Sequence, residues 1–126
     1  ASPKAVVEIR HSVLVVDDEE NFLTLLKWFL SQRGYNVSTA LSADEALDMV
    51  ENQNFDIALL DIKLGNGNGL ILLEQVTARS PPLKVIMMTA YPTVSSLQQA
   101  ASKGAMRYLT KPVDLQELTE ALKLLV

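Results

Sequence analysis

Five polar side chains stand at or near the ends of short apolar runs, and together they could bind a divalent cation. They are Asp17, Asp18, Asp61, Thr89 and Lys111. Three carboxylates that lie close together repel one another, which raises their pKa values unless a cation or hydrogen-bond donors compensate. Mg²⁺ suits such a cluster because it takes oxygen ligands, usually one or two carboxylates, water and a phosphate oxygen. The set therefore predicts a Mg²⁺ site in which Lys111 pairs with the remaining negative charge.

Each of these residues also has an ordinary structural interpretation. Asp17 and Asp18 precede a predicted helix, where acidic side chains favour the helix dipole. Asp61 could be a solvated turn residue, Thr89 a helix cap and Lys111 a surface lysine. The functional interpretation is favoured because all five follow predicted strands, in an order that would bring them to one place.

Apolar runs rich in β-branched residues alternate with stretches of helical periodicity. The runs predict strands at residues 13–16, 35–40, 57–60, 85–88 and 105–109. Helices are predicted from residue 22 to a stop at Gly34, after a capping box at residues 42–45, over about residues 70–79 and 93–103, and after a second capping box at residues 114–117. Pro81-Pro82 should end the third helix and Gly104 the fourth.

Five strands alternating with five helices predict an α/β fold. The expected architecture is a doubly wound, five-stranded parallel sheet with helices on both faces, in three αβα layers. Ligands bind such sheets beyond the carboxyl ends of the strands, which is where the five polar residues fall.

The glycine-rich stretch over residues 65–69 does not match a nucleotide-binding loop. Its spacing differs from G-x-G-x-x-G, and no Walker A lysine follows it. We expect a flexible loop that leads into the third helix. His11, the one histidine, precedes the first predicted strand and has no predicted catalytic role.

Composition limits the classes of function. The chain has 126 residues, 48% of them hydrophobic, which is enough for one domain with a full apolar core. A net charge of −4 gives the domain no electrostatic reason to bind nucleic acid directly. No apolar run is long enough to span a membrane, no signal peptide is visible, and the lack of cysteine suits a reducing cytoplasm. We expect residues 1–11 to be a flexible lead-in and residues 12–126 to be a domain cut from a longer protein.

Four stretches resemble the receiver domains of two-component response regulators. They are residues 13–19, 59–64, 88–91 and 108–112. The resemblance runs from about Ser12 to Val126 and implies a flavodoxin-like fold with strand order 2-1-3-4-5. It further implies that Asp61 is the phosphoacceptor. The phosphoryl group would come from the phosphohistidine of a sensor histidine kinase or from a small acyl phosphate. Such a domain is a switch and not an enzyme.

The resemblance also implies roles around Asp61. Asp17 and Asp18 would hold Mg²⁺ as the cofactor, Asp18 the more directly, with Asp61 and the main-chain carbonyl of Lys63 as further ligands.

Three further residues are implied to take part in switching. Thr89 would be the hydroxyl that moves toward the phosphoryl group, and Lys111 would be the ion-pair partner of that group. The Lys111–Pro112 peptide bond is expected to be cis. Tyr108 would turn inward on activation.

The resemblance implies an output face made of the fourth helix, the fifth strand and the fifth helix, through which the domain could also form a homodimer. We expect a C-terminal output domain, most naturally one that controls transcription, in a cytoplasmic protein. The domain itself should contact neither nucleic acid nor membrane.

The sequence departs from the family pattern near Asp61. Gly65 stands where proline is common, and Gly67 where a larger apolar residue is common; both should loosen this loop. Lys63 and Tyr91 occupy positions that, in this family, flank the approach of the water that hydrolyses the phosphoryl group. We expect them to give a phosphoryl lifetime longer than that of the fast chemotaxis regulators.

Two other classes of function fit the sequence less well. A phosphatase of the haloacid dehalogenase type needs a second aspartate two residues after the first, and here that residue is Lys63. An interaction module that keeps the fold without phosphorylation would not need the intact set of five polar residues.

Overall fold

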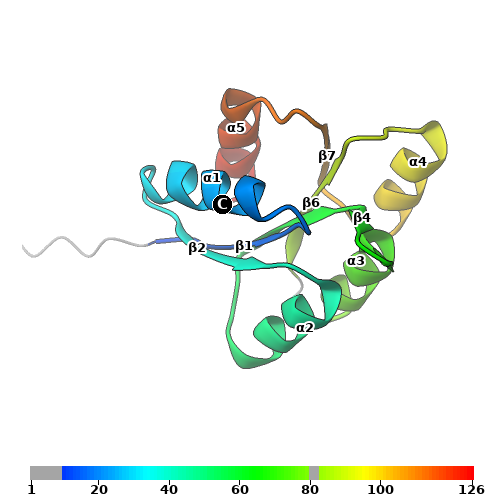
Figure 1. Cartoon of the computed structure of the whole chain (residues 1–126), viewed down its shortest axis with the longest axis horizontal. Helices are drawn as coiled ribbons and strands as arrows, with labels where there is room; N and C mark the ends of the chain where they lie inside the picture. Colours follow the sequence, from blue (N-terminus) through cyan, green and yellow to red (C-terminus); the bar gives the residue numbers. More distant parts are fainter. Residues whose placement is uncertain (1–9, 80–82) are drawn as a thin grey trace, which may run out of the picture.

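The apolar runs form one parallel sheet in the computed structural model, which describes residues 10–79 and 83–126 (Figure 1). The strand order is β2-β1-β3-β6-β7, which is the order 2-1-3-4-5 when only the strands of this sheet are counted. The strands are β1 (Ser12–Val16), β2 (Asn36–Ala40), β3 (Ile57–Asp61), β6 (Lys84–Thr89) and β7 (Arg107–Thr110). The predicted doubly wound fold is confirmed. Most of the predicted lead-in and the predicted Pro81-Pro82 helix stop lie outside the described residues.

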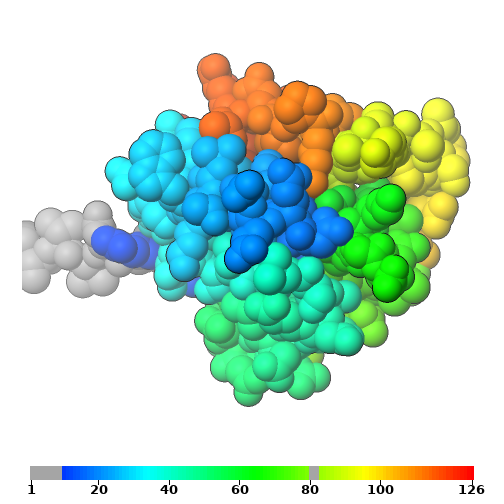
Figure 2. Space-filling model, viewed as in Figure 1, coloured from blue at the N-terminus to red at the C-terminus, as the bar shows by residue number. Residues whose placement is uncertain are grey.

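Five helices cover the sheet on both faces. They are α1 (Glu20–Ser31), α2 (Ala43–Asn52), α3 (Gly69–Thr77), α4 (Val94–Ser102) and α5 (Leu115–Leu125). Helices α1 and α5 pack on one face, and α2, α3 and α4 on the other. In the space-filling view the α1 region lies between the α5 region above it and the α2 region below it (Figure 2). Within the described residues, no helix is long and apolar enough to cross a membrane.

The alternation of side chains along β1 shows how the two cores are filled. Val13 and Val15 point to the core under α1 and α5, whereas Leu14 and Val16 point to the core under α2, α3 and α4. All four are fully buried. A central strand of a parallel sheet is covered on both faces, which explains why these runs are continuously apolar.

The helix starts differ in detail from the predicted capping boxes. The Ser42 side chain accepts from the Glu45 N–H, as expected, but the Glu45 carboxylate accepts from the Leu41 N–H, one residue before the cap. Asp114 caps α5 by accepting from the N–H groups of Gln116 and Glu117. These contacts satisfy amide groups that have no partner within the first helical turn.

The end of α4 and the loop after β3 differ most from the sequence prediction. Strand β7 begins at Arg107, because Gly104 (φ +100°) closes the end of α4 and the Ala105 N–H bonds back to the Ala100 carbonyl. The predicted flexible loop contains a two-stranded hairpin of β4 (Lys63–Leu64) and β5 (Gly67–Asn68). The sequence prediction missed this hairpin because its tight turn relies on Gly65 at φ +55°.

Candidate metal centre

The parallel topology brings the predicted polar residues to one edge of the sheet. Asp17 follows β1, Asp61 ends β3 and Thr89 ends β6. Lys111 follows β7 directly. Three of the five side chains are buried, with exposed fractions of 0% for Asp17, 6% for Asp61 and 3% for Thr89.

The three acidic side chains form a cluster that could hold a metal ion. One carboxylate oxygen from each of Asp17, Asp18 and Asp61 lies within 4.8 Å of the others. Oxygens on opposite sides of a hard divalent cation are about 4–5 Å apart, because metal–oxygen distances are about 2.0–2.6 Å. The donor set and its spacing therefore fit such a cation.

Lys111 bridges the two buried carboxylates. Its Nζ donates to Asp17 Oδ2 at 2.6 Å and to Asp61 Oδ2 at 3.0 Å. The lysine side chain is 16% exposed, so water screens this contact only weakly. The ammonium therefore supplies one positive charge to a site with three negative ones.

The local environment shifts the pKa values of Asp61 and Lys111. The pKa of the Asp61 carboxyl is raised above its ordinary value, chiefly by burial, although the hydrogen bond and charge of Lys111 lower it. The charge of Asp17 raises it further. For Lys111, burial lowers the pKa, but the contacts with Asp17 and Asp61 prevail and the pKa is raised. A bound cation would favour the ionised form of Asp61.

Backbone amides orient the three carboxylates. Asp61 Oδ1 accepts from the Lys63 N–H at 3.1 Å, and Asp17 Oδ1 accepts from the Glu19 N–H at 2.8 Å. Asp18 Oδ2 accepts from the N–H of Gly65 at 2.9 Å, which ties the exposed acid to the turn of the β4–β5 hairpin. These contacts hold each acid. Asp17 and Asp61 accept one hydrogen bond on each carboxylate oxygen, so a metal would use a remaining lone pair of such an oxygen. The metal role of the Lys63 carbonyl stays a prediction.

Thr89 and Tyr108 lie in neighbouring strands and have separate partners. Thr89 Oγ1 accepts from the Tyr91 N–H at 3.0 Å and does not cap α4, which starts from Thr93. The Tyr108 hydroxyl lies 2.6 Å from Ser96 Oγ on α4. Thr89 is therefore available at the site edge, while Tyr108 is bonded to α4.

The peptide bond between Lys111 and Pro112 is cis, the isomer that the family resemblance implies.

Gly69 is a residue near the site that the sequence analysis did not single out. A Cβ atom at this position would lie 1.9 Å from the main-chain oxygen of Asp61, far closer than atoms can pack. The Gly69 N–H also donates to the Ile62 carbonyl. Only glycine lets α3 begin so close to the strand that carries Asp61. Its place at the end of a glycine run, directly before a predicted helix, was the available signal.

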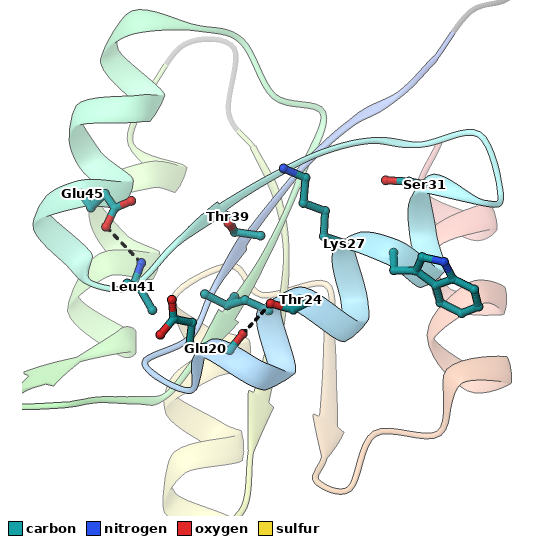
Figure 3. Close-up of a pocket in the computed structure, with 9 residues that line it drawn as sticks. Glu20, Thr24, Lys27, Ser31, Thr39, Leu41 and Glu45 are labelled. Atoms are coloured by element: carbon teal, nitrogen blue, oxygen red, sulfur yellow. Dashed lines mark hydrogen bonds between the residues drawn. The ribbon is translucent and has the colours of Figure 1, made fainter.

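A separate pocket lies beside α1 and β2, and the described residues that line it hold no comparable cluster of carboxylates (Figure 3). Its volume is 570 Å³, and residues of α1 and β2 line most of it. Two of its polar groups are engaged locally: the Glu45 carboxylate accepts from the Leu41 N–H, and the Thr24 hydroxyl donates to the Glu20 carbonyl. The acidic cluster is therefore the stronger candidate for a reactive site.

Several curated relatives of this chain are named as transcriptional regulatory proteins. Residues 13–123 match the model of the response regulator receiver domain. The transcriptional regulatory protein ZraR of Escherichia coli K12 is 38% identical over 111 residues, which are 88% of this chain and 25% of that protein. The alginate biosynthesis regulator AlgB of Pseudomonas aeruginosa is 38% identical over 84% of this chain and 24% of its own. The chain thus spans about a quarter of the length of these relatives.

Solved structures show the same fold and belong to related proteins. A CheY-like receiver domain protein from Methanospirillum hungatei JF-1 has a TM-score of 0.87 and 36% identity, covering 91% of this chain and 92% of that one. A response regulator from Burkholderia pseudomallei, with a phosphorylated aspartic acid, a calcium ion and citrate, has a TM-score of 0.84 and 34% identity over 89% of this chain and 66% of its own. With the family match extending over residues 13–123, the chain belongs to the response regulator receiver domain family.

Proposed function

We propose that this receiver domain is a Mg²⁺-dependent switch that accepts a phosphoryl group on Asp61. The observation that carries the proposal is the bridge from Lys111 to the buried Asp61 and Asp17, next to a third carboxylate at metal-binding distance. An ordinary structural aspartate would not be buried among like charges. The related structure with a phosphorylated aspartic acid and a calcium ion supports the same assignment.

In the proposed reaction an Asp61 carboxylate oxygen attacks phosphorus. The new P–O bond makes Asp61 an acyl phosphate. The bond that breaks is the P–N bond of a phosphohistidine donor or the P–O bond of a small acyl phosphate donor, and the donor leaves with that electron pair. Lys111 pairs with a phosphoryl oxygen, and the protein contributes positioning and electrostatics. Mg²⁺, when bound by Asp17, Asp18, Asp61 and the Lys63 carbonyl, supplies charge neutralisation on the transferred group.

The proposed switch begins at Thr89. A phosphoryl group adds negative charge and strong acceptors at the edge of the sheet, and the Thr89 hydroxyl is placed to donate to them. Movement of Thr89 would let Tyr108 leave Ser96 and turn inward, which would change the surface of α4, β7 and α5. A coupling of roughly 1–3 kcal/mol is enough for a useful shift between two states.

The proposal extends to partners. We assign residues 12–126 to the receiver, a sensor histidine kinase as the donor, and a covalently linked output domain that controls transcription in the cytoplasm. The names of the relatives and the share of their length that this chain covers support a longer regulator. Homodimerisation through α4, β7 and α5 is part of the same proposal. Exposed apolar side chains support it: Val94 of α4 is 72% exposed, and Met106, which directly precedes β7, is 50% exposed.

Incubation with acetyl phosphate and Mg²⁺ tests the phosphoacceptor. We expect one added phosphoryl group by mass spectrometry in the native protein, and none in Asp61→Asn or in the presence of EDTA. Asp56→Asn is the matched control, because Asp56 directly precedes the same strand and is exposed. An adduct that persists in Asp61→Asn would refute the assignment. If acetyl phosphate leaves the native protein unmodified, beryllofluoride binding is the deciding test. Binding would indicate a receiver that accepts phosphoryl groups only from its kinase, and no binding would indicate an interaction module that is not phosphorylated.

Hydrolysis of the adduct should be slow because, by the family resemblance, Lys63 and Tyr91 flank the approach of the hydrolytic water. Lys63 Nζ is 5.9 Å from the centroid of the Tyr91 ring, so the two long side chains lie near each other. We expect the double variant Lys63→Ala/Tyr91→Ala to lose the adduct roughly tenfold faster, equivalent to about 1.4 kcal/mol in the barrier. Loss of the phosphoryl mass over time measures it. Trp28→Ala, an exposed aromatic on α1, is the control. A native half-life of seconds would contradict this prediction.

A further inference from the structure

An aromatic ring lies against the ammonium group of Lys111. Phe22 is in the first turn of α1, and its ring centroid is 4.7 Å from Lys111 Nζ. The ring is half-buried and packs against the core under α1 and α5. A cation at this distance from an aromatic face is attracted by the negative charge of the ring face.

The ring completes the surroundings of the ammonium group. A lysine ammonium has three N–H donors, and here two are directed to Asp17 and Asp61. The lysine side chain is 16% exposed, which leaves little water to solvate the remainder of its charge. A largely desolvated cation–π contact changes an equilibrium constant by roughly a factor of 10.

The two carboxylate partners of Lys111 are also the groups that change during the proposed reaction. Asp61 would become an acyl phosphate, and Asp17 and Asp61 would share a cation. The contact with Phe22 is independent of both events, because the ring is anchored in α1 and the core. We propose that Phe22 is a positioning residue that keeps the Lys111 ammonium directed at the phosphoryl oxygens of modified Asp61. This inference rests on the proposed function.

The surroundings of Phe22 allow it to be changed without emptying the core. Phe22 and Lys111 line one open cavity of 500 Å³ together with residues of the β7–α5 connection. Leucine at position 22 retains an apolar side chain against the core and removes the aromatic face. Tyrosine retains the face and can place its hydroxyl in the open cavity. Leu25, one turn further along α1, lines the same cavity and serves as a control position.

Three variants test the inference: Phe22→Leu, Phe22→Tyr and Leu25→Ala. The first measurement is the proton NMR shift of the Lys111 ε-methylene group, without metal or phosphoryl mimic. We expect ring shielding in the native protein and in Phe22→Tyr, and its loss in Phe22→Leu. The second measurement is beryllofluoride affinity with Mg²⁺. We expect it to fall roughly tenfold in Phe22→Leu, to be restored in Phe22→Tyr and to be unchanged in Leu25→Ala. Urea unfolding checks that each variant is folded.

The outcomes separate this inference from the function on which it rests. An unshielded Lys111 in the native protein, or equal affinity in Phe22→Leu and native protein, would overturn the positioning role alone. A fall in affinity that Phe22→Tyr does not restore would show that Phe22 acts only through packing, and would also overturn it. If the native protein binds no beryllofluoride and takes no phosphoryl group, the proposed function fails and the inference fails with it.

Discussion

Replacing Lys111 with methionine is expected to lower the free energy of unfolding by about 3 kcal/mol at neutral pH, because it leaves two buried carboxylates without their cation. Asp17 is fully buried and Asp61 is 6% exposed, and the same ammonium donates to both carboxylates. Methionine retains most of the side-chain volume, so the loss reports charge more than packing. Urea unfolding measures the change.

The matched control is Lys103→Met. Lys103 also forms an ion pair, with Glu74, but that carboxylate is 54% exposed. An exposed pair contributes about 0–1 kcal/mol, so this variant should be close to native stability. Equal effects of the two replacements would contradict a special role for Lys111.

The pH dependence of the Lys111→Met variant follows from the direction of the Asp61 shift. Because burial raises the pKa of Asp61 in the folded protein, ionised Asp61 lowers stability above that pKa. Stability is regained as pH falls through the raised folded pKa toward the unfolded one. Without Lys111, its hydrogen bond and charge no longer lower the Asp61 pKa; the smaller effect of the Lys63 N–H remains, while burial and Asp17 still raise the pKa. Acidification from neutral pH should therefore stabilise the variant more than the native protein.

The raised pKa of Lys111 gives native stability a pH dependence of the same sign as that of Asp61, but in the alkaline range. Burial lowers this pKa, but the contacts with Asp17 and Asp61 raise it more. The resulting stabilisation is full below the ordinary lysine pKa and is lost as pH rises through the folded value. Alkaline titration of the native protein should show this loss, and Lys111→Met should not.

Mg²⁺ should partly replace Lys111 in its structural role. A metal ion that binds only the folded protein, at ten times its dissociation constant, adds about 1.4 kcal/mol to the unfolding free energy. The cluster without lysine carries one more uncompensated charge, so we expect a larger thermal shift with Mg²⁺ in Lys111→Met than in the native protein. No shift in either protein would argue against the metal site.

The location of the site could be predicted from the sequence because the carboxyl ends of parallel strands lie side by side at one edge of the sheet. Asp17, Asp61 and Thr89 end or directly follow apolar runs, and runs of this kind are recognisable without a structure. Burial on both faces of the sheet produces the continuous apolar pattern, so the fold and the site edge were predicted together.

Other features depend on contacts between distant segments and could not be predicted in the same way. The Phe22 ring meets Lys111 only because α1 packs beside the β7–α5 connection. The β4–β5 hairpin relies on a single backbone conformation at Gly65, and the Asp18 carboxylate reinforces it by accepting from the Gly65 N–H. A glycine-rich composition is compatible with a loose loop and with a tight turn alike.

Gly69→Ala is expected to destabilise the protein by about 3 kcal/mol, at the upper end of the cost of overpacking. The new Cβ would lie 1.9 Å from the Asp61 main-chain oxygen, and 2.8 Å and 2.9 Å from backbone carbons of Asp61 and Ile62. Backbone atoms cannot move aside as a flexible side chain does, so either α3 or the end of β3 must shift. Urea unfolding measures the loss of stability.

The same substitution should weaken the site, since a shift at the end of β3 displaces Asp61 from Lys111 and from the acids beyond β1. We expect Gly69→Ala to accept phosphoryl groups from acetyl phosphate more slowly even under conditions where it is fully folded. Gly67→Ala is the matched control in the same segment, because its Cβ would lie 3.2 Å from the Leu64 carbonyl oxygen, which a shift of a few tenths of an ångström relieves. If Gly69→Ala lost stability but kept the native rate, the helix would have moved and the strand would have stayed. The close approach of α3 would then serve the fold alone, and Asp61 would be positioned by its own strand and the Lys63 N–H.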